Sequence, residues 1–399
     1  MLTLVIPTRN RPQWLRRLLL YYRREKLSVP ILVADSSRDE EARANRDAVR
    51  QASETLRIGY QANDAEIPFC EKAVRAVESA DSEFLVFCAD DDFLIPSGMT
   101  ACAEFLKNHP DYSLAHGRSV TLKISPDATE RPVPWDKVRC TVYRQRAVEA
   151  EGAAQRLRDH LDNYASTFYS VHRGDQLARN LRATADHTSD VRFGELLPSA
   201  LSVVQGKVKQ LDALYMVRQA HGEATSLAEG SISDLLKEAD FSRRYGAVRD
   251  CLAEELARAI GVAPEQGVDE IDRAFNAYLR RTRRREERME ASAQGARAGE
   301  TGAPCARSGA MLWTRRLARL ARAAPATLRA ATVGGGLADL LRSPRIFLKE
   351  IEERRRAGSE TAHFSVIPLM DPRSPLFEDF RGPRELVQRY PFGVPPDSG

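Results

Sequence analysis

Residues 83–96 read EFLVFCADDDFLIP, and this stretch decides the class of fold that the chain is expected to adopt. The apolar run from Phe84 to Ala89 has the length and composition of a buried β-strand. Asp90, Asp91 and Asp92 follow directly, and no basic residue stands beside them in the sequence. Adjacent carboxylates repel one another. Something distant in the sequence must therefore balance this charge at the end of the strand.

Outward from this strand, the first 122 residues alternate between β-rich apolar runs and segments with helical spacing. The expected elements are strand 2–6, helix 12–26, strand 31–34, strand 56–60, helix 70–80, strand 84–89, helix 97–108 and strand 113–122. Strands that alternate with helices and are apolar throughout favour a parallel sheet covered on both faces. The sequence therefore predicts an α/β fold with a mostly parallel central sheet.

Polar residues follow three of the expected strands. They are PTRN at 7–10, DSS at 35–37, where a side chain can also cap the next helix, and DDD at 90–92. Ligands of parallel sheets bind beyond the carboxyl ends of the strands, so these three segments are expected to converge on one site. Neither a G-x-G-x-x-G nor a P-loop motif occurs, which argues against a dinucleotide oxidoreductase or a P-loop NTPase.

Composition sets outer limits on function. The chain has 399 residues, with 60 Lys and Arg against 56 Asp and Glu, so overall charge does not indicate nucleic-acid binding. No apolar run approaches the roughly 18 residues that span a bilayer. The N-terminus, MLTLVIPTRN, lacks the basic start of a signal peptide. The six cysteines never form a C-x-x-C pair, which argues against zinc or a disulfide framework. A cytoplasmic location is expected.

The rest of the chain alternates less regularly. The expected elements are strand 167–172, helix 193–206, strand 208–217, a helical extension at 226–290, a flexible linker at 291–310, a basic amphipathic helix at 311–329 and a Pro-rich segment at 364–390 that is able to pack back on the core. The arginines at 311–329 fit either a helix packed on the catalytic domain or one lying on anionic lipid. They lack the interleaved aromatics of a nucleic-acid site.

The three aspartates predict a cation site. Close carboxylates either share protons or hold a cation, and hard oxygen ligands suit Mg²⁺ or Mn²⁺. Such ions usually bind through one or two carboxylates together with substrate phosphates. A phosphorylated substrate, most simply a nucleoside diphosphate, is therefore expected. An ordinary acidic surface turn is the alternative.

Three motifs together resemble the successive signatures of family-2 glycosyltransferases with the GT-A fold. They are LVIPTRNR at 4–11, VADSS at 33–37 and CADDDF at 88–93. The chain also resembles a bacterial subgroup of that family that has the same DDDF and AHG stretches. The resemblance covers residues 1–225, and it implies a nucleotide-binding half at 1–122 and an acceptor half at 123–225.

The resemblance implies a donor site at the strand ends. Asp35 would hydrogen-bond the base, commonly uracil in this family, and Asp92 would be the principal metal ligand. Asp90 would meet the ribose or metal side of the donor, and Asp91 the sugar hydroxyls. The remaining implied donor-site residues are Pro7, Thr8 and Arg9 in the nucleotide pocket and Lys72 near the nucleotide or sugar.

An acceptor hydroxyl needs a general base because its own pKa is high. The family usually supplies an Asp or Glu at the start of a helix in the second half of the domain. Glu195 matches that position best, although Leu196 stands where the family has an Asp. Asp190 is the second candidate, and a structural role at the helix start is the alternative for both.

The stretch RQAH at 218–221 resembles the late motif of the family, whose side chains return to the diphosphate. Arg218 would contact a phosphate bidentately, and His221 would ligate the metal. A solvent-facing role is the alternative for both residues. His116 would line the acceptor side or be a satisfied core histidine.

The expected function is metal-assisted, inverting transfer of a sugar from a nucleotide-diphosphate sugar, most simply UDP-linked, in bacterial glycan or glycoconjugate synthesis. The acceptor would be a glycan, a lipid-linked molecule or a protein, with peripheral membrane contact through 311–329. A nucleotidyltransferase is an alternative, but it would normally show a Gly-rich loop where this chain has PTRN. A non-catalytic scaffold at a membrane assembly stays open because of Leu196.

Overall fold

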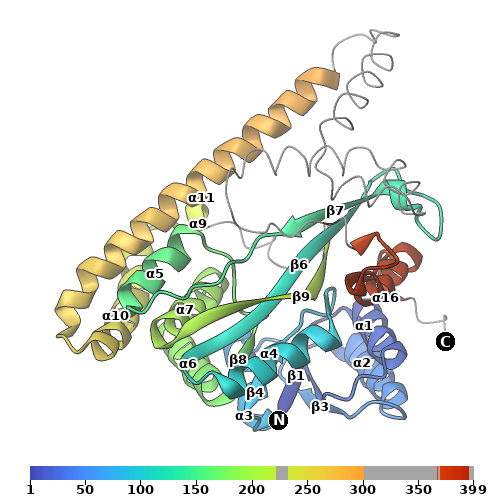
Figure 1. Cartoon of the computed structure of the whole chain (residues 1–399), viewed down its shortest axis with the longest axis horizontal. Coiled ribbons are helices and arrows are strands. Elements are labelled where there is room, and N and C mark those ends of the chain that lie inside the picture. The colour runs from blue at the N-terminus through green and yellow to red at the C-terminus, as the bar shows by residue number, and fades with distance from the viewer. Residues whose placement is uncertain (222–231, 301–365, 367–368, 395–399) are drawn as a thin grey trace.

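Nine strands form one mixed sheet in the computed structural model, which describes residues 1–221, 232–300, 366 and 369–394 (Figure 1). Along the sheet the order is β3 (Ile58–Ala62), β2 (Ile31–Asp35), β1 (Leu2–Thr8), β4 (Phe84–Phe87), β8 (Val171–Arg173), β6 (Tyr112–Ile124), β9 (Lys207–Ala220) and β5 (Phe93–Leu94), with β7 (Val138–Tyr143) paired to β6. The predicted α/β fold is confirmed.

The strand directions divide the sheet. Strands β3, β2, β1 and β4 are all parallel, and β6 and β9 form a second parallel pair. The pairs β4–β8, β6–β8, β6–β7 and β5–β9 are antiparallel. In the first group Thr8 lies opposite Asp35, so β1 and β2 end side by side.

Helices cover both faces of the sheet. They are α1 (Pro12–Arg24), α2 (Asp39–Ala52), α3 (Phe69–Ala80), α4 (Pro96–Asn108), α5 (Ala153–Asp162), α6 (Gly174–His187), α7 (Val191–Gln205), α9 (Ile232–Leu235), α10 (Phe241–Ile260), α11 (Pro264–Glu300) and α16 (Pro375–Arg389). Leu4 and Ile6 pack in one core with α1, α4 and α16, whereas Val5 packs in another with α3 and α6. Both faces of β1 are therefore buried, which explains its continuous apolar sequence.

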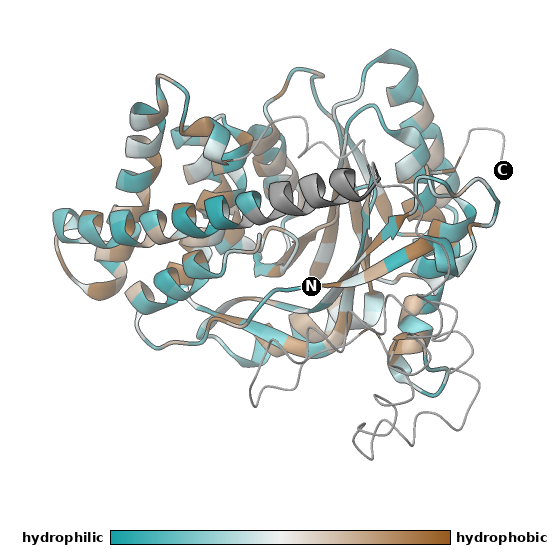
Figure 2. Cartoon of the chain, turned by 90° about the horizontal axis from the view of Figure 1, so that it is seen from above, coloured by the Kyte–Doolittle hydropathy of each residue, from teal (hydrophilic) through white to brown (hydrophobic). Residues whose placement is uncertain are grey.

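The helical extension shares a core with the second half of the sheet domain. Apolar residues of α10 and α11 pack with those of α5 and α7 in one buried cluster. The long helix α11 runs past α5 and α10 (Figure 1), and much of it is hydrophilic (Figure 2). None of the helices in the described ranges combines the length and the apolar sequence that crossing a bilayer requires.

Two details of the sequence analysis need correction. Helix α11 continues to Glu300, so residues 291–300 are helical where a linker was predicted. Their sequence, ASAQGARAGE, is rich in alanine, the strongest helix former. The side chains of 35–37 do not cap α2, because its N-cap is Arg38, which makes no side-chain capping bond. Residues 301–310 and the basic segment 311–329 lie outside the described residues.

The C-terminal segment packs back on the core, as the sequence analysis allowed. Helix α16 lies beside α1 (Figure 1) and contributes Phe380, Leu386 and Val387 to the same core as β1. Backbone bonds extend the contact, from Val133 N to Gln388 O at 2.8 Å and from Val394 N to Gln13 O at 2.8 Å. The last described residues therefore lie against the start of α1.

Candidate functional site

The three polar strand ends meet at one edge of the sheet, as predicted. The hydroxyl of Thr8, at the end of β1, donates a hydrogen bond to Asp90 Oδ2 at 2.7 Å. Lys72 of α3 donates to Thr8 O at 3.1 Å and to Ser36 Oγ at 2.9 Å. One threonine and one lysine thus connect the ends of β1, β2 and β4.

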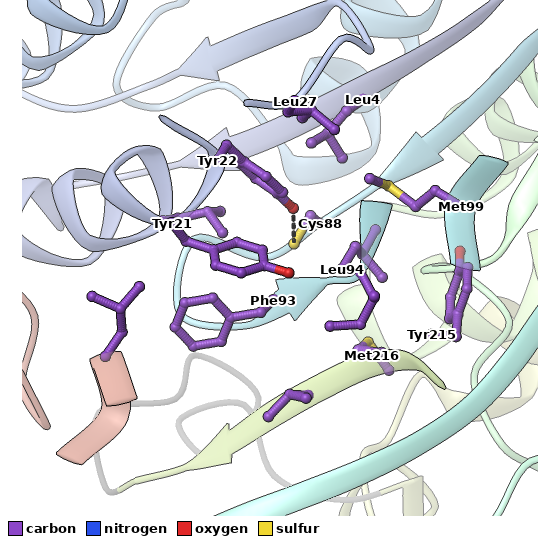
Figure 3. Close-up of a cluster of buried hydrophobic side chains, with 14 of the residues drawn as sticks. Leu4, Tyr21, Tyr22, Leu27, Cys88, Phe93, Leu94, Met99, Tyr215 and Met216 are labelled. Carbon is purple, nitrogen blue, oxygen red and sulfur yellow. Dashed lines mark hydrogen bonds between the residues drawn. The ribbon is translucent and has the colours of Figure 1, made fainter. Parts of the chain in front are cut away.

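The aspartates lie in a short connection between two buried strands. Residues 89–92, here called the carboxylate loop, follow β4 and precede β5, and Asp92 N closes a turn by donating to Ala89 O at 3.2 Å. The hydrophobic cluster beside the loop includes Phe93, Leu94 and Cys88, whose thiol contacts the Tyr22 hydroxyl at 3.7 Å (Figure 3). Side chains packed on both ends of the loop therefore fix its position.

Arg11 balances much of the charge of the carboxylate loop. Its Nη1 lies 2.9 Å from Asp90 Oδ1 and its Nη2 lies 2.7 Å from Asp91 Oδ2. Arg11 stands at the N-cap of α1, and its guanidinium lies 5.4 Å from the centre of the Trp14 ring. No sequence pattern predicted a role for Arg11. Its place just after the first polar strand end is the signal that could have found it.

Arg218 and Gln219 hold the side chain of Asp92. Arg218 Nε lies 3.2 Å from Asp92 Oδ2, and Gln219 N donates to Asp92 Oδ1 at 2.9 Å. The guanidinium of Arg218 also lies over the rings of Tyr143, at 4.9 Å, and Tyr169, at 5.9 Å. The solvent-facing alternative for Arg218 therefore does not hold.

The three carboxylates are buried, with exposed fractions of 3%, 7% and 4%. Burial raises the pKa of Asp90 to about 7 and that of Asp92 to about 6, although Arg11 and Arg218 oppose the shift. At Asp91 burial also acts to raise the pKa, but hydrogen bonds from His221 and Arg11 overcome it, so the pKa is lowered. The environment therefore separates the acidities of three adjacent aspartates.

Arg17 is fully buried and supports the carboxylate loop through a hydrogen bond. Arg17 Nη2 donates to Asp91 O at 2.7 Å, and its Nη1 donates to Gln219 Oε1 and, at 3.1 Å, to Tyr390 O. Gln219 Nε2 in turn donates to Pro391 O at 2.7 Å. Burial lowers the pKa of Arg17 to about 10. The C-terminal segment is thus linked to the carboxylate loop through Arg17 and Gln219, a contact that the sequence did not indicate.

The residues predicted as metal ligands do not fit a divalent cation in this arrangement. Asp90 accepts from Thr8 and Arg11, Asp92 accepts from Gln219 and Arg218, and His221 Nε2 lies 2.8 Å from Asp91 Oδ2. Among the described residues, no group of three or more His, Cys, Asp or Glu side chains could hold a metal ion. The predicted ligand set Asp92, Asp90 and His221 is therefore not assembled, because protein donors occupy the carboxylate oxygens.

Asp35 is also bound by its own chain. Its Oδ1 accepts from Ser37 N at 2.7 Å, and its Oδ2 accepts from Asn45 Nδ2 at 2.9 Å and from the Tyr60 hydroxyl at 2.7 Å. These bonds hold the loop after β2 in shape. The predicted contact of Asp35 with a base remains a prediction.

The other predicted donor-site residues lie around this edge. Pro7 pairs with Ala34 in the sheet, and Arg9 is about half-exposed at the rim, 3.7 Å from Glu66. Lys72 is buried, and burial lowers its pKa to about 8. The edge thus offers buried and exposed cations to an anionic ligand.

Asp190 serves the start of α7. Its Oδ1 accepts from Arg192 N at 2.9 Å, the geometry of an N-cap, and its Oδ2 lies 2.6 Å from Arg192 Nη2 and 3.0 Å from Arg244 Nη1. Burial acts to raise its pKa, but the bonds from Arg192 prevail and the pKa is lowered. The structure therefore shows Asp190 in the structural role at the helix start, and its role as a base stays a prediction.

Glu195 lies one turn further along α7 and is partly buried. Burial raises the pKa of Tyr169, and the next contributions come from the negative charge of Glu195, then from Arg218, Asp92 and Asp91. Tyr169 is thus close enough to both Glu195 and the carboxylate loop to sense their charges. This proximity keeps Glu195 as the candidate base.

His116 is a buried histidine on β6. One ring nitrogen lies 3.0 Å from Gly117 O, and burial lowers its pKa. It also lines a cavity of about 290 Å³ together with Gln145, His160 and Thr167. His116 is therefore a core histidine at a cavity wall, and its place on the acceptor side stays a prediction.

No protein-family model and no curated protein sequence matches the chain. Among solved structures it is similar to S. aureus TarS (residues 1–349) in complex with UDP-GlcNAc, with 17% identity and a TM-score of 0.44 over 70% of this chain and 71% of that one. It is also similar to the mannosyltransferase PcManGT from Pyrobaculum calidifontis in complex with GDP-Man and Mn²⁺, with 14% identity and a TM-score of 0.36 over 80% of each chain. Because both TM-scores lie below 0.5, neither likeness supports a statement about the activity of this chain.

Proposed function

We propose that the chain is a glycosyltransferase that moves a sugar from a nucleotide-diphosphate sugar to an acceptor hydroxyl. One observation carries the proposal. The ends of β1, β2 and β4 meet in a polar site, where Lys72 joins the ends of β1 and β2, and Thr8 of β1 and Arg218 of β9 contact the carboxylate loop. The resemblance of the three strand-end motifs to family-2 glycosyltransferases with the GT-A fold agrees with this arrangement.

The cations of the site suit a diphosphate. Arg9 is about half-exposed, and Arg218 is about one-third exposed beside Asp92. A guanidinium can bind phosphate oxygens bidentately and stabilise the charge that develops on the leaving diphosphate. In this proposal the nucleotide lies along Pro7, Thr8, Arg9 and Asp35, and Arg218 faces its phosphates.

Glu195 then acts on the acceptor. Its carboxylate accepts the proton of the acceptor hydroxyl as that oxygen bonds to the anomeric carbon. The bond from the anomeric carbon to the phosphate oxygen breaks, and its electron pair leaves with the diphosphate. Direct displacement by an oxygen on the opposite face inverts the anomeric configuration. Glu195 on α7 and Arg218 on β9, with Tyr169 near both, are compatible with this geometry.

A calorimetric panel tests the proposal. Purified full-length chain is titrated in the presence of Mn²⁺ with UDP, GDP, ADP and CDP, and then with sugar nucleotides of the diphosphate that binds. We expect one nucleoside diphosphate to bind, UDP being the first candidate. Affinity should fall at least about tenfold in Arg218→Gln, since one charged hydrogen-bonding partner contributes about 1.5–3 kcal/mol. No binding of any nucleoside diphosphate would contradict the proposal.

The acceptor and the membrane contact are separate parts of the proposal. We propose a glycan, lipid-linked or protein acceptor and peripheral contact with anionic lipid through residues 311–329. The basic sequence of that segment supports the contact. Flotation of the full-length chain with anionic and with neutral vesicles tests it. Flotation with anionic vesicles alone is expected, and failure to float with either removes the idea.

A further inference from the structure

We propose that Arg11 takes the place of a divalent cation at the carboxylate loop, so that nucleoside-diphosphate binding in this chain needs no metal. The inference rests on the proposed function, because it concerns how the same site holds its donor. It departs from the metal site that the sequence predicts, and the contacts of the loop carry it.

Protein donors hold five of the six carboxylate oxygens of the loop. Asp90 Oδ1 faces Arg11 and Oδ2 accepts from Thr8, and Asp91 Oδ2 faces Arg11 and His221. Asp92 Oδ1 accepts from Gln219 N, and Asp92 Oδ2 faces Arg218. A cation binding here would have to break several of these bonds at once.

Arg11 makes the contacts that a bridging cation would make. A divalent ion between carboxylates joins oxygens from more than one of them, and Arg11 joins Asp90 and Asp91 at 2.9 Å and 2.7 Å. The planar guanidinium has donors in a fixed fork that matches this task. The bridge therefore supplies the charge neutralisation for which the sequence analysis invoked a metal.

Aspartates and basic side chains around the loop are equal in number. Asp35, Asp90, Asp91 and Asp92 are matched in number by Arg11, Arg17, Arg218 and Lys72 (their contacts are given above). A divalent ion at the loop would lie close to the guanidinium groups of Arg11 and Arg218. Like charges repel strongly where water is largely excluded. Repulsion from these guanidinium groups therefore opposes metal binding at this position.

Arg11 is also held in place by its surroundings. It stands at the start of α1, its guanidinium lies 5.4 Å from the Trp14 ring, and its side chain is 17% exposed. The Trp14 ring stacks on His221 at 4.3 Å with an interplanar angle of 15°. His221 and Arg11 thus contact both Asp91 and Trp14, and the four side chains form one packed unit. Moving Arg11 aside for a metal would disturb this packing.

Calorimetry of the wild-type chain in EDTA and in Mn²⁺ tests the inference. The nucleoside diphosphate that binds in the panel above is titrated under both conditions. We expect dissociation constants that agree within about threefold, a difference below 1 kcal/mol. Binding in Mn²⁺ that disappears in EDTA would overturn the inference and leave the proposed function standing. The absence of binding in both conditions would instead contradict the proposed function.

Arg11→Gln sharpens the test. Removing the guanidinium leaves Asp90 and Asp91 without their shared cation, so nucleotide binding in EDTA should weaken at least about tenfold. Mn²⁺ should now restore part of the affinity, because the position of the missing charge is open to it. Arg23→Gln, an exposed change in the last turn of the same helix, is the matched control and should behave like wild type.

Measurements on Arg11→Gln can also contradict the inference. If Arg11→Gln binds nucleotide as wild type does in EDTA, Arg11 does not perform the proposed role. Thermal unfolding of Arg11→Gln identifies a variant that fails to fold. In that case Arg11→Lys replaces it, since it keeps one charge but cannot bridge both carboxylates in a planar fork. Partial loss of metal-free binding is then expected, and wild-type affinity contradicts the inference.

Discussion

Two regions of the molecule pair aspartates with arginines, but in different surroundings. At the carboxylate loop, Arg11 and Arg218 reach Asp90, Asp91 and Asp92 from positions far away in the sequence. At the start of α7, Asp190 pairs with Arg192, two residues on, and with Arg244. The pKa values of Asp90 and Asp92 are raised by burial, whereas that of Asp190 is lowered because its bonds to arginine prevail.

This difference distinguishes a candidate functional site from a contact that only stabilises the fold. A buried, charged cluster at strand ends lowers stability unless every member is paired, and such strained clusters are typical of functional sites. A capped helix start with nearby arginines stabilises the fold and needs no ligand. The same residue types therefore carry different meanings, and the position of the carboxylate loop at the strand ends distinguishes them.

The largest expected effect concerns Glu195, which shares α7 with Asp190. Glu195→Gln should lower the rate of sugar transfer by about 10²–10⁴-fold, because the amide cannot accept a proton. Donor affinity measured by calorimetry should stay unchanged. Glu254→Gln on the exposed side of α10 is the control. A normal transfer rate in Glu195→Gln would remove Glu195 as the base.

The second effect tests the support of the carboxylate loop by Arg17. Arg17→Met should lower the free energy of unfolding by about 3 kcal/mol, because it leaves the carbonyl oxygens of Asp91, Gln219 and Tyr390 without their donor. Urea denaturation measures the loss. Arg16→Met changes the neighbouring, less buried position and should stay within about 0.5 kcal/mol of wild type. Equal stability of the two variants would show that the Arg17 network contributes little.

The third effect is a pH dependence caused by Lys72. The folded chain lowers the pKa of Lys72 from 10.5 to about 8, so between these values the unfolded chain binds more protons. The free energy of unfolding should therefore rise with pH across this window, by up to about 1.4 kcal/mol per pH unit. Below pH 8 the cost of the buried charge is present in full. The difference between wild type and Lys72→Met, measured by denaturation at several pH values, isolates this slope. A flat difference contradicts it.

The smallest expected effect concerns Asp190 at the start of α7. Asp190→Ala should lower the free energy of unfolding by about 1 kcal/mol, the usual value of an N-cap, while sugar transfer stays close to wild type. Denaturation and a transfer assay on the same preparation measure both. A large loss of transfer without loss of stability would support a catalytic role for Asp190.

The sequence predicted which edge of the sheet holds the candidate site. It did not predict which residues balance the charges of that site. The apolar runs around Leu4 and Val86 predicted buried strands, and the polar residues that follow them predicted where those strands converge. Arg11 contacts Asp91 across 80 positions, and Arg17 contacts Gln219 across 202. Such contacts depend on the packing of distant elements, which no local pattern encodes. For the same reason the sequence did not show that protein donors hold the oxygens of the predicted metal ligands Asp90 and Asp92.

The C-terminal segment illustrates the same limit. Its proline-rich sequence indicated only that it could return to the core. Its bonds from Gln219 to Pro391 and from Arg17 to Tyr390 arise because α16 packs beside α1. The support of the carboxylate loop thus depends on residues at the opposite end of the chain.

The central claim is that the nucleotide binds at the ends of β1, β2 and β4. Hydrogen exchange with and without a saturating nucleoside diphosphate tests it most directly. The account predicts slower exchange in residues 8–11, 36–37, 89–92 and 218–221, with little change in α10 and α11. Protection confined to the helices of the extension, or to the cavity beside His116, would contradict it.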